Sequence, residues 1–414
     1  MTELCSHRDN CRLCGATTLE RVLKLTPTPP ANAFISKSDL KVPQPCFPLD
    51  IYFCNTCAHV QLLDVVDAHV LFENYVYVSG TSPVFVKHFK DYAHSLINGF
   101  NIPKKSLVLD IGSNDGTLLK AFKNLNQNVL GVDPAKDIAA AATKNGIPTI
   151  ADFFTAQLAK QIVNQHGPAI LITANNVFAH ADDLQGILEA VKIALNEQGL
   201  FVFEVSYVLD VYEKTLFDTI YHEHLAYHSV KPLKQFFAAN GFQFIKAVRV
   251  PSHGGSLRGV VAKIQSDHKP DGSVEKLIAQ EEKSGIDKAA TWHCFNDQIN
   301  QVKSDLMALL KNAKQQGKSI AAFGAPAKAT TLMYHFGLGP DFIDFIIDDS
   351  PLKQGLYSPG MHIPVLSSSA IYDKKPDIIV ILAWNFADAI MAKHQEFLNT
   401  GGQFIVPLPN VENF

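Results

Sequence analysis

The chain has 414 residues, of which 47% are apolar and 18% charged, and its formal net charge is −4. This length exceeds what one hydrophobic core fills, so two or three domains are expected. The sequence has no basic stripe interleaved with aromatic residues, which argues against a nucleic-acid partner. It also lacks an apolar run of about 18 residues and a basic segment leading into an apolar core. We therefore expect no membrane partner and a cytoplasmic location.

Six of the seven cysteines lie within the first 57 residues, and four of them form two C-x-x-C pairs, Cys11 with Cys14 and Cys54 with Cys57. Each pair places two sulfurs on one tight turn, and two such turns supply a tetrahedral cage for Zn²⁺. In a cytosolic protein this pattern favours metal over a disulfide. Four sulfurs leave no open position, so we expect a structural zinc in a module of residues 1–70. Reduced thiols or a redox pair are the alternative.

Residues 71–285 contain the pattern of a cofactor site. An apolar strand expected at 107–111 runs into the glycine-rich turn DIGSNDG, and the next strand, 129–132, ends in Asp133. The glycines let the backbone turn sharply and approach a ligand. An acid at the tip of the second strand binds the hydroxyls of a ribose. The turn is not G-x-G-x-x-G, which disfavours a dinucleotide, and Asp115 suits the amino group of S-adenosylmethionine (SAM).

Two further strand ends strengthen this interpretation. A short strand at 147–150 precedes an acid and an aromatic residue that could hold adenine, and a strand at 170–176 ends in polar residues. We therefore expect a SAM-dependent methyltransferase. Its cofactor contacts are predicted at Asp110, Gly112, Asn114, Asp115, Gly116, Asp133, Asp152, Phe153 and Asn175. The alternative is an ordinary βαβ unit with a glycine turn, because a fold does not imply a function.

The rest of the chain predicts more α/β structure. A turn is expected at 196–199, followed by a fifth strand at 201–205, and further strands are expected at 242–246 and 257–264. Apolar residues at helical spacing predict a helical linker over 273–316. From about residue 317 a second α/β unit begins, with strands expected at 319–323, 342–347 and 377–382. The turn after its first strand contains Lys328 and enters a helix. This is a candidate phosphate site, with plain Rossmann-like packing as the alternative.

The segment from 219 to 228, TIYHEHLAYH, is dense in proton-transfer groups. It follows the fifth strand and should overhang the edge of the sheet where the methyl donor binds. Histidine acts as a base near neutral pH, and His180 leaves the fourth strand towards the same face. Two alternatives remain open: a second metal site made by His222, His224 and His228, or histidines with structural roles.

In its combination of motifs the sequence resembles the SAM-dependent sugar C-methyltransferases of branched deoxysugar biosynthesis. The resemblance covers the whole chain and rests on the two cysteine pairs, YVYVSG, DIGSNDG, NNVFAH, YHEHLAYHS, GAPAK and AWN. It implies an α/β protein with three parts. These are a zinc-binding module (1–70), a class I (Rossmann-like) SAM methyltransferase domain (71–285) and a C-terminal Rossmann-like domain that binds the nucleotide sugar (286–414).

The resemblance also implies a reaction, methylation at C3 of a nucleotide-linked 4-keto-6-deoxy sugar. The carrier is most often dTDP, with GDP and CDP left open. The keto group acidifies the C3 hydrogen, a base removes it, and the resulting enolate attacks the methyl group of SAM.

The family pattern suggests His224 as the base, with Glu223 beside it. It suggests Tyr75 and His180 as groups that orient the sugar or stabilise the enolate. Tyr221 would help to position SAM. Substrate contacts are expected at His222, Arg258, Lys328, Lys353, Trp384 and Asn385.

Rival functions predict different behaviour. An O- or N-methyltransferase would need no acidic carbon. A zinc hydrolase built on the three histidines would hold a second zinc and need no SAM, and a non-catalytic nucleotide-sugar-binding protein would bind without turnover. For the preferred function a monomer suffices, and we expect a monomer or a weak homo-oligomer.

Overall fold

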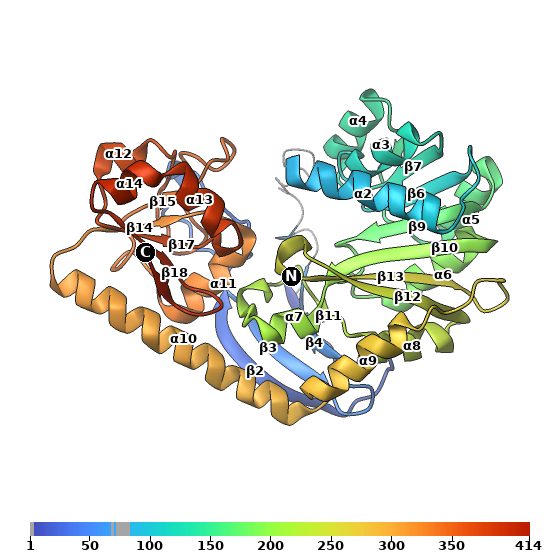
Figure 1. The fold of residues 1–414 in the computed structure, drawn as a ribbon, viewed down its shortest axis with the longest axis horizontal. Coiled ribbons are helices and arrows are strands. Elements are labelled where there is room, and N and C mark those ends of the chain that lie inside the picture. Colours follow the sequence, from blue (N-terminus) through green and yellow to red (C-terminus); the bar gives the residue numbers. More distant parts are fainter. Residues whose placement is uncertain (1–3, 68–69, 72–82) are drawn as a thin grey trace.

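The computed structural model describes residues 4–67, 70–71 and 83–414, and it shows two lobes joined by long strands and one long helix (Figure 1). The lobe that contains the green and cyan elements has a seven-stranded sheet, and the red lobe has a six-stranded sheet. Blue strands near the N-terminus run beneath and between the lobes. A small two-stranded sheet pairs β1 (Cys5–His7) with β5 (Asp64–Val66).

The seven-stranded sheet places the expected cofactor strands side by side. Its order is β12 (Phe242–Val250), β13 (Ser256–Lys263), β10 (Leu195–Ser206), β9 (Ala169–Asn175), β6 (Leu107–Ile111), β7 (Asn128–Val132) and β8 (Thr149–Ile150). The five strands from β10 to β8 are parallel, and β13 runs antiparallel between β10 and β12. The carboxyl ends of β6, β7, β8 and β9 therefore meet at one edge, where ligands bind in such sheets.

Helices cover both faces of this sheet (Figure 1). They are α2 (Pro83–Gly99), α3 (Thr117–Asn124), α4 (Lys136–Lys144), α5 (Ala156–His166), α6 (Leu184–Ala194), α7 (Val208–Glu213), α8 (Val230–Ala239) and α9 (Ser273–Ser284). Fully buried aromatic side chains fill the space between sheet and helices, among them Phe178, Phe201, Phe203 and Phe237. Burial of this apolar surface is the main stabilising contribution of the lobe.

An antiparallel sheet links the cysteine-rich region to the methyltransferase lobe. Its order is β11 (Ala226–Tyr227), β4 (Val60–Leu62), β3 (Phe47–Cys54) and β2 (Leu19–Thr28). Three of these strands come from the first 70 residues, whereas β11 belongs to the histidine-rich segment. The two parts of the chain therefore share one sheet, and the histidine-rich segment is attached to the N-terminal module by backbone pairing.

The C-terminal lobe has the order β16 (Val365–Leu366), β15 (Ile346–Ile347), β14 (Ile320–Phe323), β17 (Ile378–Ile381), β18 (Gln403–Val406) and β19 (Glu412–Asn413). All neighbours are parallel except the last pair. Its helices are α11 (Ala327–Phe336), α12 (Ala370–Lys374), α13 (Ala387–Lys393) and α14 (Gln395–Asn399). This is the Rossmann-like α/β unit that the sequence predicts.

Two expected elements differ from the structure. The predicted turn at 196–199 lies inside β10, where the pairing with β9 shifts between Leu195 and Leu200, so these residues form an irregularity in one long strand. The predicted helical linker is two helices, because Gly285 ends α9 in a left-handed conformation (φ 71°). The second helix, α10 (Ala289–Gln315), buries the expected apolar stripe and contacts β2. Among the described residues, no helix combines the length and apolarity that a bilayer span requires.

Candidate active site

The four predicted zinc ligands come together. Cys11, Cys14, Cys54 and Cys57 place their sulfurs within 4.8 Å of one another, and no other described residues form a comparable group of metal-binding side chains. The Sγ–Sγ distances are 3.7 Å for Cys11 to Cys57 and 3.6 Å for Cys14 to Cys54. A tetrahedral Zn²⁺ with Zn–S bonds of about 2.3 Å has sulfur–sulfur edges of roughly 3.8 Å. The site therefore fits a closed structural zinc.

The cofactor turn after β6 depends on two glycines. Gly112 and Gly116 have φ values of 66° and 76°, the left-handed region that other residues rarely adopt. A Cβ on Gly112 would lie 2.3 Å from the side chain of Val177, and one on Gly116 would lie 2.8 Å from that of Ile147. Both positions therefore require glycine for space as well as for conformation.

Asp133 at the end of β7 organises this turn. Its Oδ2 accepts the N–H of Asn114 at 2.8 Å and its Oδ1 accepts the N–H of Ala135 at 2.9 Å. Burial raises the pKa of Asp133, whereas the two amide donors lower it. Asp110 lies inside the sheet, where it accepts the hydroxyl of Thr173 at 2.6 Å, and burial raises its pKa to about 7. Through this bond Asp110 joins β6 to β9 inside the sheet, next to the cofactor turn.

The remaining predicted cofactor residues line the same edge. The side-chain amide atoms of Asn175 are buried at the end of β9, where the hydroxyl of Tyr92 is a neighbour. A buried amide at this position suits a polar ligand at this edge. Phe153 is 60% exposed, so its ring can stack on a planar ligand. Asp152 accepts the N–H of Phe153. Asp115 Oδ1 accepts the N–H and hydroxyl of Thr117 and so caps α3.

His224 is held at both ring nitrogens. Its Nδ1 lies 2.9 Å from the carbonyl oxygen of Thr219, which can only accept, so Nδ1 carries the proton. Its Nε2 then accepts the hydroxyl of Tyr221 at 2.8 Å. Thr219 belongs to the short helix η3 (Phe217–Thr219), which follows α7. The imidazole is therefore fixed in the tautomer in which Nε2 is the accepting nitrogen and bonds the hydroxyl of Tyr221.

His180, on the loop that follows β9, joins this pair. The ring centroids of His180 and His224 are 4.8 Å apart. Glu223 does not support His224 in the expected way, since its hydrogen-bond partner is the side-chain amide of Asn32 at 3.0 Å. Burial raises the pKa of Glu223 to about 7. Tyr75, the remaining predicted catalytic residue, lies outside the described residues.

The other two histidines of the segment have packing roles. His222 is 1% exposed, packs edge-on against Phe47 and donates to its carbonyl oxygen at 3.2 Å. This burial corrects the expectation that His222 contacts the substrate. His228 is fully buried, where its ring stacks on His59 and on Phe178. The alternative of a metal site formed by the three histidines is therefore not supported.

The predicted residues of the C-terminal lobe meet the methyltransferase lobe at Asp218. Lys328 Nζ lies 3.7 Å from Asp218 Oδ2 and 3.4 Å from the centroid of the Trp384 ring, in the short helix η5 (Trp384–Phe386). The indole nitrogen of Trp384 donates to the same carboxylate oxygen at 2.6 Å. Burial lowers the pKa of Lys328 to about 8, and Asp218 opposes that shift.

Lys353 lies beside this cluster, and Asn385 is exposed on η5. The ammonium of Lys353 donates to the carbonyl oxygen of Ala325 at 2.6 Å and lies 5.3 Å from the centroid of the Phe34 ring.

The environment of Arg258 does not fit the expected role of a phosphate ligand. Its guanidinium makes two hydrogen bonds to Glu204 and covers the ring of Tyr92, so its charge is already neutralised.

Some residues of the site escaped the sequence-based prediction. Thr219, Asn32 and Asp218 orient predicted residues through a carbonyl oxygen, an amide and a carboxylate. Thr219 is the first residue of the histidine-rich segment and Asp218 directly precedes it, which is a usable signal. Asn32 lies 191 residues from Glu223, and no local pattern marks it.

The order of the seven-stranded sheet, its antiparallel β13, the glycine turn after β6 and the acid after β7 define a class I methyltransferase. Three family profiles match consecutive parts of the chain. They are a putative zinc-binding domain at 11–72, a methyltransferase domain at 87–247 and a C-methyltransferase C-terminal domain at 251–409.

The C-methyltransferase NovU of Streptomyces niveus is 33% identical over 401 residues, which cover 97% of this chain and 96% of NovU. The chain therefore belongs to this C-methyltransferase family. It is a SAM-dependent methyltransferase with an N-terminal zinc-binding domain, as the sequence predicts.

Two solved structures align with less than half of the chain. Magnesium protoporphyrin IX methyltransferase of Synechocystis PCC 6803 is 13% identical with a TM-score of 0.35, covering 43% of this chain and 83% of its own. The 1,6-didemethyltoxoflavin-N1-methyltransferase of Burkholderia thailandensis is 18% identical with a TM-score of 0.33, covering 45% and 81%. Likenesses this distant do not bear on the substrate.

Proposed function

We propose that the enzyme methylates a carbon beside the keto group of a nucleotide-linked 4-keto-6-deoxy sugar, at C3, with dTDP as the first-choice carrier. The observation that carries this proposal is the arrangement of His224, Tyr221 and His180. A carbon nucleophile has to be made by removing a proton, and this cluster supplies a fixed base with hydrogen-bond donors around it. Transfer to oxygen or nitrogen would need no acidic carbon, so the hydrogen at C3 would be retained.

The hydroxyl of Tyr221 turns from Nε2 of His224 to the keto oxygen, and His224 then removes the proton from the carbon beside the keto group and takes it on Nε2. The electron pair of the broken C–H bond moves to the keto oxygen, and donors beside His224 stabilise the resulting enolate. The imidazolium that forms is stabilised through Nδ1–H by the carbonyl oxygen of Thr219, 2.9 Å away. SAM would supply an electrophilic methyl group on its sulfonium sulfur; its transfer to the carbanionic carbon would break the methyl–sulfur bond and leave an uncharged thioether. Holding both reactants in line contributes on the order of 7–11 kcal/mol.

Glu223 has a different role from that of an orienting carboxylate. With a pKa of about 7 and one oxygen bonded to the amide of Asn32, it is largely protonated below neutral pH. A neutral carboxyl group donates a hydrogen bond, so Glu223 can hold the keto oxygen or a hydroxyl group of the sugar. This donor adds to those of His180 and Tyr221.

The C-terminal lobe supplies the positive charge for the carrier. Lys328 lies in the first turn of α11, and the ammonium of Lys353 reaches the carbonyl oxygen of Ala325 just before that helix. Burial lowers the pKa of both lysines. Two ammonium groups at a helix N-terminus suit a diphosphate. Trp384 and Asn385 lie next to Lys328 and complete the proposed substrate contacts. In this scheme residues 1–70 hold zinc, 71–285 transfer the methyl group and 286–414 bind the nucleotide.

Mass spectrometry of products tests the proposal. The enzyme is incubated with SAM and a panel of 4-keto-6-deoxy sugars linked to dTDP, GDP or CDP. We expect a gain of one methyl group on one panel member, mapped to C3 by fragmentation. Both carbons beside the keto carbon are acidic, so the same experiment separates C3 from C5. A methyl group on oxygen or nitrogen, or no product from any sugar despite SAM binding, would refute the proposal.

A further inference from the structure

We propose that the zinc module positions both histidines of the active site, and that Arg12 is the positioning residue for His180. Arg12 lies between the zinc ligands Cys11 and Cys14. The inference rests on the proposed function only where it assigns catalytic roles to the histidines. The structural connection itself is independent of the substrate.

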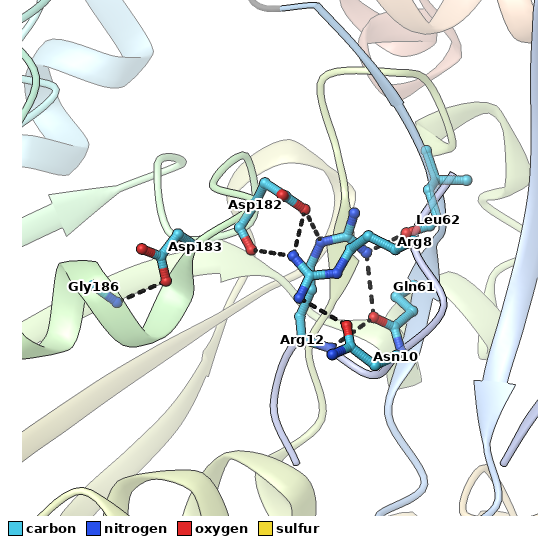
Figure 2. A network of polar contacts seen from close by, with 8 residues as sticks. All are labelled: Arg8, Asn10, Arg12, Gln61, Leu62, Asp182, Asp183 and Gly186. Carbon is cyan, nitrogen blue, oxygen red and sulfur yellow. Dashed lines mark hydrogen bonds and ion pairs between the residues drawn. The ribbon is translucent and has the colours of Figure 1, made fainter. Parts of the chain in front are cut away.

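The contacts of Arg12 bridge two parts of the chain (Figure 2). Its side chain is fully buried, and its Nε donates to Asp182 Oδ1 at 3.0 Å. On its other side Nη1 donates to the carbonyl oxygen of Leu62 and, at 3.2 Å, to Gln61 Oε1. Arg8 donates to the same Asp182 oxygen at 2.9 Å and to the Asp182 carbonyl oxygen at 3.1 Å. A carboxylate on the loop before α6 is thus held by two arginines of the N-terminal module.

This loop carries His180. It spans residues 176–183, and His180 is two residues from Asp182. At one end the N–H of Asn176 binds the carbonyl oxygen of Glu204, and at the other Asp183 accepts the N–H of Gly186 and caps α6, as Figure 2 shows. Between these ends the loop is attached to other elements through Phe178, Ala179 and Asp182. The arginine contacts therefore constrain the loop on the side of His180 that leads to α6.

The second cysteine pair fixes His224 in the same way. Cys54 and Cys57 lead into β4, where the N–H of Leu62 donates to the carbonyl oxygen of Leu225 at 3.0 Å and Gln61 pairs with Ala226. Ala226 in turn donates to Ala179 of the His180 loop at 3.1 Å. Both histidine segments are therefore attached to strands and turns that a zinc ion on the four cysteines would hold together. Through these attachments a closed metal site would act on the chemistry without touching the reactants.

Arginine is required at position 12 for a geometric reason. One planar guanidinium binds a carboxylate through Nε and a carbonyl through Nη1, whereas an ammonium is a point charge that cannot reach both. Asp182 is 43% exposed and also bound by Arg8, so loss of Arg12 removes one of two arginine contacts to Asp182 and both contacts to Gln61 and Leu62. The Asp182 loop should therefore be held less firmly against β4. A displacement of about 1 Å at a reacting group can lower the rate about 100-fold.

The test compares the full-length variants R12Q and R12K with R21Q. Arg21 is half exposed and pairs with Asp50 on the same N-terminal sheet, so R21Q removes an ion pair that has no contact with the loop. We expect R12Q to lower kcat 10- to 100-fold with unchanged KM, full zinc content by elemental analysis and an unchanged folded fraction. R12K should be impaired similarly, and R21Q should behave as the wild type. D182N should reproduce R12Q, and the double variant should be no worse than either.

A second measurement needs no substrate. The imidazole resonances of His180 and His224 are assigned by histidine substitution. The His180 resonances should shift in R12Q, and both sets should stay in place in R21Q. Unchanged resonances together with a wild-type kcat would overturn the inference, as would a loss of kcat that only follows zinc content or folded fraction. If the wild-type enzyme turns over no sugar, the proposed function fails, and the resonances alone decide the inference.

Discussion

At the residue scale, the chemistry depends on which nitrogen of His224 carries its proton. The carbonyl oxygen of Thr219 fixes that proton on Nδ1, and the lone pair on Nε2 accepts the hydroxyl of Tyr221. The histidine-rich motif suggested a base but not this arrangement, because the orienting group is a main-chain carbonyl. The motif also suggested more reactive histidines than there are, since burial assigns His222 and His228 to packing.

Glu223 makes the stability of the enzyme depend on pH. Its pKa is raised from 4.5 to about 7 by burial, so the folded state holds this proton more tightly than the unfolded state. The stability it contributes is complete below about pH 4.5 and is lost as the pH rises through 7. Between pH 4.5 and 7 the free energy of unfolding of Glu223→Gln should therefore fall less than that of the wild type, by on the order of 3 kcal/mol.

The measurement for Glu223→Gln is urea denaturation at several pH values. Glu189→Gln, an exposed glutamate on α6, is the control and should follow the wild type. Parallel pH profiles for wild type and Glu223→Gln would show that Glu223 is ionised throughout.

Asp133 should determine SAM affinity. It holds the cofactor turn through two backbone amides and lies where the ribose is expected. Replacing it by alanine removes two hydrogen bonds to a charged group, each worth about 1.5–3 kcal/mol. Asp133→Ala should therefore weaken SAM binding by 10- to 100-fold or more in isothermal titration calorimetry. Asp137→Ala, an exposed change on α4, should not. Equal affinities would remove Asp133 from the cofactor site.

At the element scale, the β-strands were the most predictable features. Continuous apolar runs mark buried parallel strands such as β6 and β9, and the residues after them mark the ligand edge. Prediction was weaker where geometry breaks the pattern, as at the irregularity of β10 and the break at Gly285. The pairing of β11 with β4 was not predictable, because two residues carry no periodic signal.

The two cysteine turns should unfold together when one ligand is lost. Cys54 is fully buried at the end of β3, so serine there removes a thiolate and leaves a hydroxyl in an apolar place. Cys54→Ser should bind little zinc and melt at a lower temperature, as measured by elemental analysis and calorimetry. Cys294→Ser, on an exposed face of α10, is the matched control. Full zinc content in Cys54→Ser would mean that the ligand set is different.

At the scale of the whole molecule, contacts between distant segments assemble the site. Trp384 reaches Asp218 across 166 positions, and Arg12 reaches Asp182 across 170. Each residue type is ordinary in its local sequence, so only the fold shows the pairing. The fold class and the cofactor edge could be predicted from local patterns, whereas the supports of the site could not.

Lys328 should link substrate affinity to pH. Its pKa is lowered to about 8 by burial, so it loses its charge as the pH rises through this value. The KM for the nucleotide sugar should therefore increase above about pH 8 in the wild type. Lys328→Met should raise KM about tenfold at pH 7 and remove this dependence, with SAM affinity unchanged. Lys393→Met, half exposed in the same lobe, should keep the wild-type profile. A Lys328→Met enzyme with the wild-type KM at pH 7 would exclude Lys328 from the carrier site.

The central claim is that His224 generates a carbanion, and hydrogen exchange without methyl transfer tests it most directly. The substrate sugar is incubated with the enzyme in deuterated water in the absence of SAM, and deuterium at C3 and C5 is measured by NMR. The wild type should introduce deuterium at the methylated carbon, and His224→Asn should do so at least 100-fold more slowly while still binding SAM. Equal exchange by both enzymes, or methylation with the original hydrogen retained, would contradict the mechanism.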